Sequence, residues 1–190
     1  MKDERRPGAR GRPRGFDTDV ALDRAIEVFW RRGYSGAGIA ELTVAMGISP
    51  PSLYAAFIDK RGLFLVALDR YAATLGARPL DALRTTDGSG KLRAFLRAAV
   101  DLAHSGCARG CLAACVAVDA AGDDEIIRER LHLMMREHER ALEEAAGGTP
   151  SGRLLLAAMH AIAVRARAGA TADELDALVS DLETQLLTRE

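Results

Sequence analysis

Aromatic side chains are scarce in this 190-residue sequence, at 5% of all residues, and no segment shows the alternation of polar and apolar residues typical of strands. A sheet-based fold is therefore not expected. Long apolar runs are missing too. The longest, Leu154 to Val164, is interrupted by His160 and is too short to span a bilayer. No apolar segment follows the charged N-terminus, so we expect no secretory signal, no membrane partner and a cytoplasmic location.

The sequence also has few of the features that enzymes and disulfide-rich proteins need. Its three cysteines form an odd count, which favours free thiols over a disulfide framework. A glycine-rich phosphate loop, a Gly-x-Ser-x-Gly motif and a His-Glu-x-x-His motif are all absent. A Cys–His nucleophile pair would have no third residue placed to orient it. We therefore expect neither catalysis nor a cofactor.

Charge of one sign does not dominate the whole chain, but it is unevenly distributed. The formal net charge is −1, whereas residues 1–62 hold 11 Lys and Arg against 8 Asp and Glu, a net of +3, and the remainder carries −4. Residues 1–16 alone carry +4 and are rich in Gly and Pro. This composition predicts a flexible basic arm. The arm is either a solubilising tail or a segment that lies along phosphates or in a minor groove.

Helix-forming residues are what the sequence has in abundance, since Ala, Leu, Arg and Glu dominate. Apolar residues recur at helical spacing from Leu22–Phe29 to Leu175–Leu186. Capping residues, among them Asp17, Asp59 and a capping box at Thr171–Glu174, and glycine breaks divide this pattern into about nine helices. One of them, near Cys111–Ala121, is short and almost wholly apolar. The predicted fold class is all-α, with a small N-terminal unit of three helices followed by a larger helical bundle.

Two short predicted helices, around Ile39–Ala45 and Pro50–Phe57, are joined by Met46-Gly47-Ile48-Ser49. A turn of this length with a glycine at the break is what a helix-turn-helix needs, because Gly47 permits a reversal that a Cβ atom would resist. Small side chains at the start of the second helix would let its backbone approach a major groove closely. Short helices in an ordinary bundle can show the same pattern by chance.

Residues 14–64 resemble the DNA-binding domain of the TetR family of bacterial one-component repressors. The landmarks that carry the resemblance are Ala25-x-x-x-Phe29, Gly33-Tyr34, Ile39-Ala40, Met46-Gly47-Ile48-Ser49, Leu53-Tyr54-x-x-Phe57, Lys60 and Leu63-Phe64. Residues 11–17 also resemble the N-terminal arm of one branch of that family. The resemblance implies an arm at 1–16, a helix-turn-helix DNA-binding domain at 17–62, and a ligand-binding and dimerisation domain at 63–190.

The resemblance also implies which side chains touch DNA. Tyr54 and Lys60 would contact phosphates and set the register, while the exposed face of the second short helix would read bases. The full predicted set of contacts is Arg12, Arg14, Thr43, Ser49, Pro50, Ser52, Tyr54 and Lys60. One departure from the family pattern is Ala37-Gly38, where a hydroxyl residue usually caps the helix and touches a phosphate. Because this recognition helix is poor in Arg, Asn and Gln, base reading is expected to rest on few direct contacts plus DNA shape.

For the C-terminal part, the resemblance implies a homodimer formed through the last two helices, 149–167 and 171–189. A two-fold protein suits a palindromic operator. The alternative is that Leu154–Val164 is the central core helix of a monomer. The resulting hypothesis is a repressor released from double-stranded operator DNA by an unidentified small-molecule inducer. A helical adaptor that binds protein is a remote alternative, because it would not need Tyr54, Lys60 and a basic arm on one surface.

Cys107, Cys111 and Cys115 are spaced four residues apart. On an unbroken helix they would share one face, which could sense a soft metal or an oxidant. Gly106, just before Cys107, and Gly110, between Cys107 and Cys111, disfavour an unbroken helix. A buried cysteine is most often a small apolar core residue. We therefore predict no metal site. Cys111 and Cys115 are kept as candidates for a ligand pocket, with metal or thiol-redox sensing as the alternative function.

Overall fold

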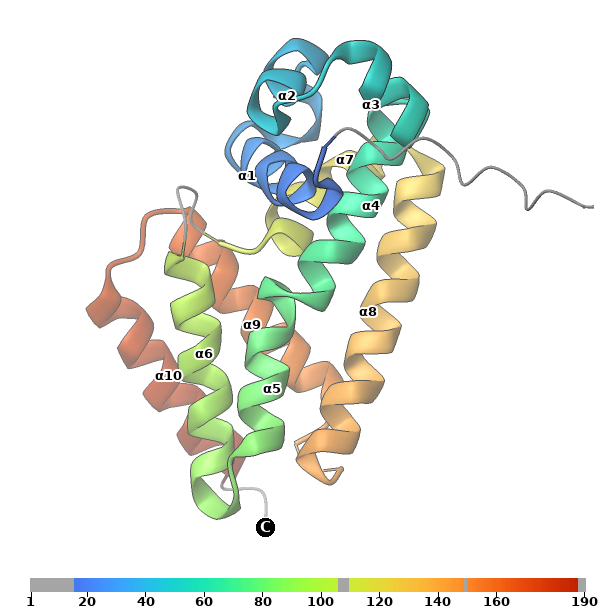
Figure 1. Cartoon of the computed structure of the whole chain (residues 1–190). Coiled ribbons are helices and arrows are strands. Elements are labelled where there is room, and N and C mark those ends of the chain that lie inside the picture. The colour runs from blue at the N-terminus through green and yellow to red at the C-terminus, as the bar shows by residue number, and fades with distance from the viewer. Residues whose placement is uncertain (1–15, 106–109, 149, 188–190) are drawn as a thin grey trace, which may run out of the picture.

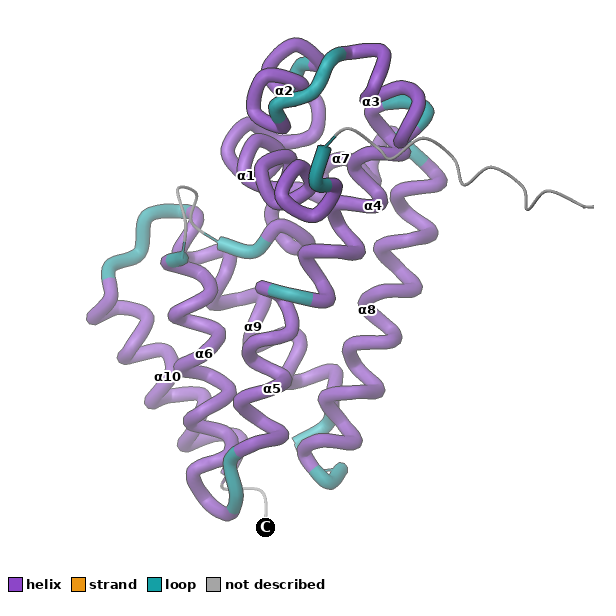
Figure 2. Tube along the Cα trace, viewed as in Figure 1, coloured by secondary structure: helices purple, strands orange, loops and turns teal. Residues whose placement is uncertain are grey.

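The computed structural model describes residues 16–105, 110–148 and 150–187 of the chain. The described part is all-α, as the sequence predicts, and contains no strand (Figures 1 and 2). Its N-terminal unit consists of α1 (Thr18–Gly36), α2 (Ile39–Met46) and α3 (Pro50–Phe57). The bundle consists of α4 (Lys60–Ala73), α5 (Arg78–Thr85), α6 (Lys91–His104), α7 (Val118–Asp123), α8 (Glu125–Ala146), α9 (Gly152–Arg167) and α10 (Ala172–Leu187). The predictions made for Arg12, Arg14 and Cys107 lie outside the described residues.

Side-chain caps fix where several helices begin. Asp17 accepts hydrogen bonds from the first turn of α1, Asp59 accepts one from Gly62 N at 2.7 Å, and Asp124 caps α8. At the start of α10, Thr171 N donates to Glu174 Oε2 at 2.7 Å and Glu174 N donates to Thr171 Oγ1 at 3.3 Å. This reciprocal pair is the capping box that the sequence predicts. Each of these caps satisfies backbone N–H groups that would otherwise lack a partner.

Two regions differ from the sequence-based expectation. Helix α5 was not predicted; it is a short amphipathic helix that buries Pro79, Leu80 and Leu83. The single helix expected near Cys111–Ala121 is instead a π-helical turn over Ala113–Ala117 followed by α7. Turns of this kind are frequent at functional sites. In this region it carries Cys115 and lies next to α9 and α1 in the packing.

Apolar side chains form two cores. The first joins α1, α2 and α3 to the buried face of α4 and extends through residues 111–121 to the start of α8. The second fills the space between α5, α6, α8, α9 and α10. Helix α4 packs on α1, and α1 also contacts α7 and the π-helical turn, so the N-terminal unit meets the bundle through both α4 and the segment at residues 113–123 (Figure 1). None of the described helices is long and apolar enough to cross a membrane.

Polar contacts hold the N-terminal unit against the bundle. The Arg70 guanidinium of α4 binds Asp23 of α1 with N–O distances of 2.6 and 2.8 Å. Arg167 Nη1 at the end of α9 donates to the Trp30 carbonyl of α1 at 2.8 Å, and within the bundle Arg130 of α8 binds Asp69 of α4. Partly exposed ion pairs contribute little stability individually. Their geometry instead fixes the orientation of α1 relative to α4 and α9.

Candidate nucleic-acid interface

The turn between α2 and α3 has the geometry of a helix-turn-helix. Gly47 adopts a left-handed conformation (φ 69°, ψ 33°), and Ile48 N donates to the Thr43 carbonyl at 3.1 Å. Ser49 then caps α3, accepting a hydrogen bond from Ser52 N at 3.3 Å. Since this φ strains any residue with a Cβ, the turn explains why glycine occupies position 47. Pro50 begins α3, where a missing N–H is not needed.

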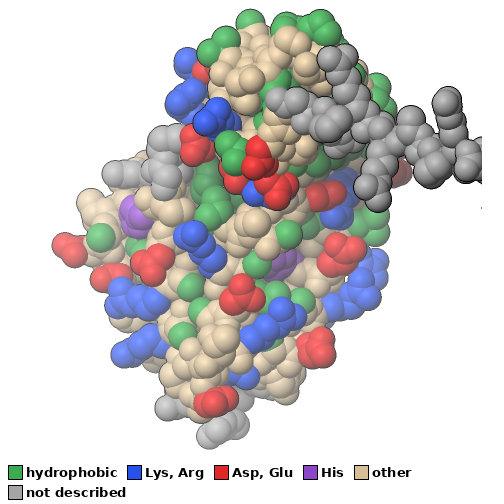
Figure 3. All heavy atoms as spheres, viewed as in Figure 1, with side chains coloured by type: hydrophobic (Ala, Val, Ile, Leu, Met, Phe, Trp, Pro, Cys, Tyr) green, Lys and Arg blue, Asp and Glu red, His purple; other side chains and the backbone are tan. Residues whose placement is uncertain are grey.

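Helix α3 has one buried and one exposed face. Leu53 and Phe57 point into the first core, whereas Pro50, Pro51 and Ala55 are exposed and Tyr54 is 49% exposed. A surface hollow of about 400 Å³ lies along this helix, lined by Phe16, Gly47, Ile48, Ser49, Ser52, Ala55 and Ala56. The α2–α3 unit lies at one end of the molecule, and hydrophobic side chains are visible at the surface of that end (Figures 1 and 3). The exposed face of the predicted recognition helix is the one that carries Pro50, Pro51, Tyr54 and Ala55.

Lys60 is the first residue of α4 and lies beside the end of α1. Its ammonium donates to the Ser35 carbonyl at 3.3 Å and sits 4.9 Å from the centre of the Tyr34 ring. Partial burial lowers the pKa of Lys60. An ammonium has three donors, so the contact with Ser35 leaves two N–H groups for an anion.

Thr43 is a correction to the predicted set of DNA contacts. Its side chain is only 4% exposed, and its hydroxyl donates to the Ile39 and Ala40 carbonyls of its own helix at 2.9 and 3.0 Å. The neighbouring Val44 is the residue that α2 exposes, at 82%. Thr43 faces the first core because the 3.6-residue period places it on the same side as Leu42 and Met46. We therefore remove it from the set.

The departure at Ala37-Gly38 is visible in the structure. Gly38 is the N-cap residue of α2 and offers no side-chain hydrogen bond. Nearby, Arg31 Nη2 and Arg32 Nε each lie 3.1 Å from Glu41 Oε1, which lowers the pKa of the Glu41 carboxyl. These two exposed arginines were not singled out from the sequence. Arg31 and Arg32 are adjacent in the sequence and directly precede Gly33, where α1 has a kink. This pair of cations next to a glycine break is the signal that could have placed them near the start of α2.

A small cavity lies inside the bundle, between α4, α8, α9 and the turn before α7. Its volume is about 30 Å³, and its lining is Tyr71, Ala72, Gly76, Cys111, Ala113, Met134, Met135, His138, Leu156, Met159 and His160. Tyr71 also packs edge-on against Trp30 of α1, with ring centres 5.4 Å apart. Nε2 of His138 is buried and has no hydrogen-bond partner among the described residues. A cavity with a few convergent polar groups is the default ligand site of a helical bundle.

Burial controls the ionisation of the groups around this cavity. It raises the pKa of the Cys111 thiol and of the Tyr71 phenol, and it lowers the pKa values of His138 and His160. The Tyr71 hydroxyl donates to Cys111 Sγ at 3.3 Å. A thiol held protonated in an apolar site is a poor nucleophile and a poor metal ligand. The described residues include no group of three or more His, Cys, Asp or Glu side chains placed to hold a metal.

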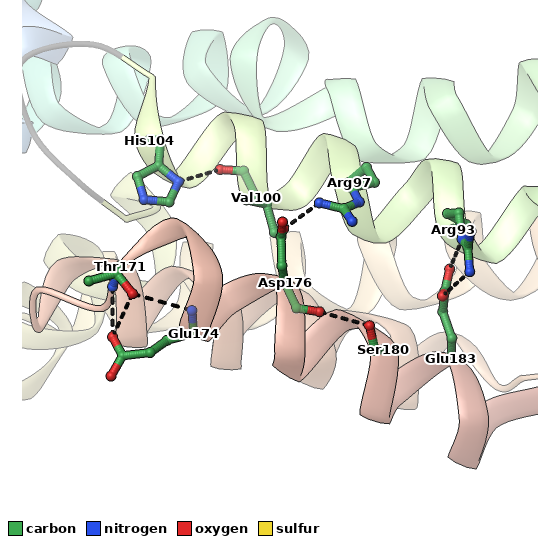
Figure 4. A network of polar contacts seen from close by, with 9 residues as sticks. All are labelled: Arg93, Arg97, Val100, His104, Thr171, Glu174, Asp176, Ser180 and Glu183. Atoms are coloured by element: carbon green, nitrogen blue, oxygen red, sulfur yellow. Dashed lines mark hydrogen bonds and ion pairs between the residues drawn. The ribbon is translucent and has the colours of Figure 1, made fainter.

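The last two helices, α9 and α10, differ in what their outer faces contact. Helix α10 is tied to α6: Arg93 binds Glu183 with N–O distances of 2.7 and 2.8 Å, and Arg97 binds Asp176 (Figure 4). Helix α9 instead presents a row of apolar side chains to solvent: Leu154 (45% exposed), Ala157, Ala161 and Val164 (53% exposed). These positions, spaced three or four residues apart, form one stripe. We call it the α9 stripe.

Comparison with known proteins relates both parts of the chain to one family. The model for "Bacterial regulatory proteins, tetR family" matches residues 21–67. The repressor ComR of Escherichia coli (strain K12) is 47% identical over 70 residues, which cover 37% of this chain and 33% of ComR. The repressor BdcR of the same strain is 36% identical over 104 residues, covering 54% of this chain and 53% of BdcR. The chain thus matches only a third to about half of these curated relatives.

A solved structure extends the likeness over nearly the whole chain. The TetR family transcriptional regulator CifR, solved as a cysteine mutant with 26-bp double-strand operator DNA, is 34% identical. The match covers 94% of this chain and 100% of that chain, with a TM-score of 0.77. SCO4454 of Streptomyces coelicolor, at 18% identity and a TM-score of 0.73, shares the fold.

Proposed function

This chain belongs to the TetR family of bacterial regulatory proteins, and from that premise we propose that it is a repressor that binds palindromic operator DNA as a homodimer. The exclusion of an enzyme from the sequence is confirmed, because the family consists of transcriptional regulators. The observation that carries the proposal is the α2–turn–α3 unit, with Gly47 in the turn and the outer face of α3 exposed. The names of ComR and BdcR as repressors support this assignment.

In the proposed complex, the N-terminal end of α3 enters the major groove. The hydroxyl of Tyr54, which is half exposed, contacts a phosphate, and the free N–H groups of the Lys60 ammonium contact another. Ser49, Pro50 and Ser52 lie at the end of α3 that faces the bases. Arg12 and Arg14 of the arm add contacts to the backbone or the minor groove. Phosphate contacts set the register, while the face of α3 supplies sequence preference.

The α9 stripe supports a homodimer. Exposure of Leu154 and Val164 to water costs free energy, and burial of the stripe against a second copy of the same helix would remove that cost. A two-fold pairing of α9 would bring the stripe against itself, as an isologous interface requires. The two α3 helices would then be related by the same axis and could read two half-sites.

The bundle cavity is the proposed inducer site. At about 30 Å³ it holds little more than one water molecule, whereas ligand pockets for organic molecules measure several hundred Å³. An inducer therefore has to push the lining apart, and the flexible side chains of Met134, Met135 and Met159 make this possible. Because Tyr71 lines the cavity and packs on Trp30, this expansion would shift α4 relative to α1. A coupling free energy of about 1–3 kcal/mol is typical of such a link.

The test begins with selection of binding sites from a random duplex library, followed by fluorescence anisotropy on the selected site. Tyr54→Phe should weaken binding by about two- to tenfold, because one hydroxyl hydrogen bond is lost. Lys60→Gln should reduce the slope of log affinity against log salt by about one. Arg136→Gln removes an exposed cation from α8 and should change neither quantity. Failure to select any sequence would refute the proposed function.

A further inference from the structure

The outer face of α3 lacks every side chain that ordinarily distinguishes bases by paired hydrogen bonds. The helix reads Pro50-Pro51-Ser52-Leu53-Tyr54-Ala55-Ala56-Phe57 and contains no charged or amide residue. Bidentate recognition of guanine uses Arg or Lys, that of adenine uses Asn or Gln, and cytosine is read by Glu or Asp. None of these contacts can be made from α3.

The hydroxyl groups near the start of α3 are already engaged. Ser49 Oγ and Ser52 Oγ lie 2.9 Å apart, and Ser49 Oγ also accepts from Ser52 N at 3.3 Å. A serine hydroxyl contacts several bases equally well, so it discriminates poorly. Of the two other hydroxyls in the unit, that of Thr43 is buried and bonded to its own helix, and that of Tyr54 is the one assigned above to a phosphate. Hydrogen bonding from this surface is therefore weakly selective.

What α3 does present is a surface of small apolar side chains. Pro50, Pro51 and Ala55 are exposed, and Ala55 lines the hollow of about 400 Å³ beside the helix. In the major groove the one apolar group that marks a base is the C5-methyl of thymine. Short side chains let the helix backbone come close enough to bring its carbon atoms into contact with such methyl groups. The prolines have no N–H to leave unsatisfied in that contact.

We propose that the protein reads its operator half-sites mainly through thymine C5-methyl groups, which Pro50, Pro51 and Ala55 contact. This inference rests on the proposed function, because it concerns the DNA that the same surface binds. The half-sites then contain thymines under α3, and the methyl groups, rather than the hydrogen-bonding edges of the pairs, carry the preference. Burying one methyl group is worth a factor of about three to five in affinity.

The experiment compares thymine with uracil, which differs only in lacking the methyl group. Two random duplex libraries are prepared, one with deoxythymidine and one with deoxyuridine, and each is selected with the full-length protein. The site recovered from the first library is then resynthesised with single thymine-to-uracil replacements. Anisotropy is measured for each duplex with the wild type, with Ala55→Gly, and with Ala73→Gly, which makes the same change at an exposed position at the end of α4.

The expected result is a three- to fivefold loss of wild-type affinity at two or more uracil positions in each half-site. Ala55→Gly should bind the thymine site more weakly and should no longer distinguish thymine from uracil at one of these positions. Ala73→Gly should retain the full discrimination. If Ala55→Gly unfolds, Ala55→Ser replaces it in the test. Serine keeps the Cβ atom at the contact but adds a hydroxyl, which makes the contact with the thymine methyl group polar.

Three results would overturn the inference. The first is recovery of the same site with equal affinity from the uracil library. The second is a uniform loss at every thymine, inside and outside the half-sites, which indicates a response to DNA shape. The third is unchanged discrimination in Ala55→Gly and Ala55→Ser. In each case sequence-specific binding is retained and the proposed function stands, whereas recovery of no site from either library refutes the proposed function instead.

Discussion

Ile58 is the one non-glycine residue of the described chain with a positive φ. Its φ is 71° and its ψ is −56°, and Asp59 N donates to the Phe57 carbonyl at 2.8 Å across it. This is a γ-turn with positive φ, a rare and strained geometry, and a β-branched side chain makes it worse. The side chain is 83% exposed, so no burial offsets the strain.

Replacing this residue should therefore stabilise the protein. Ile58→Gly is expected to raise the free energy of unfolding by about 0.5–2 kcal/mol, because glycine tolerates positive φ and little buried surface is lost. Val44→Gly is the matched control: it removes an equally exposed β-branched side chain from helical backbone and should lower that free energy by up to about 1 kcal/mol. Urea denaturation measures both. A destabilised Ile58→Gly would show that the turn is not strained.

His138 and His160 make stability depend on pH. Burial, and then the charge of Arg84, lowers the pKa of His138; burial, and then His138 itself, lowers that of His160. In the unfolded chain each titrates near the ordinary value of about 6.5. Below that pH the unfolded state binds more protons than the folded state, so the free energy of unfolding should fall as the pH drops from about 7.5 to 5.5.

Variants of the two histidines test this pH dependence. In His138→Gln or His160→Gln, the free energy of unfolding should fall less steeply as the pH drops. Urea denaturation at several pH values measures this slope. His132→Gln, which changes an exposed histidine of the same helix α8, should leave the slope as in the wild type. Equal slopes in all three variants would locate the pH dependence elsewhere.

At the scale of elements, the sequence predicts most of this fold because caps and periodicity are local signals. Asp17, Asp59 and the Thr171–Glu174 box begin helices where expected. Helix α5 was missed because it has only eight residues, one of them Pro79 in its first turn, and these give too short a periodic pattern. The π-helical turn before α7 was missed because its packing against α9 and α1, rather than local sequence, sets its geometry. Thr43 was assigned a DNA contact by resemblance alone, without regard to which side of the short helix α2 faces the core.

The corner between α3 and α4 is set by close packing as well as by the turn at Ile58. A Cβ atom added at Gly62 would lie 2.1 Å from the Phe57 carbonyl oxygen. Gly62→Ala is therefore expected to lower the free energy of unfolding by about 1–3 kcal/mol, since backbone has to move. Gly122→Ala in α7 meets nothing within 4 Å and should be neutral or slightly stabilising. Thermal and urea denaturation distinguish the two, and equal effects would contradict the packing argument.

At the scale of the whole molecule, the proposed homodimer depends on the α9 stripe. Leu154→Glu places a charge within the stripe and should convert a dimer into a monomer, measured by light scattering after gel filtration. Operator affinity should fall with it, since two recognition helices are no longer held on one axis. Leu133→Glu alters a leucine of similar exposure on α8 (55% against 45%) and should leave the dimer intact. A dimeric Leu154→Glu would place the interface on another surface.

The corner at Ile58 and Gly62 has a mechanical consequence. A hinge needs a compliant joint, but here the chain passes from α3 to α4 through a three-residue turn with no space for one additional carbon atom. Helices α3 and α4 are therefore expected to move together as one rigid unit. In the proposed mechanism, movement of α4 near Tyr71 is expected to be transmitted to α3 rather than absorbed by bending of the turn. A stiff connection of this kind means that a small displacement in the bundle is enough to move the recognition helix.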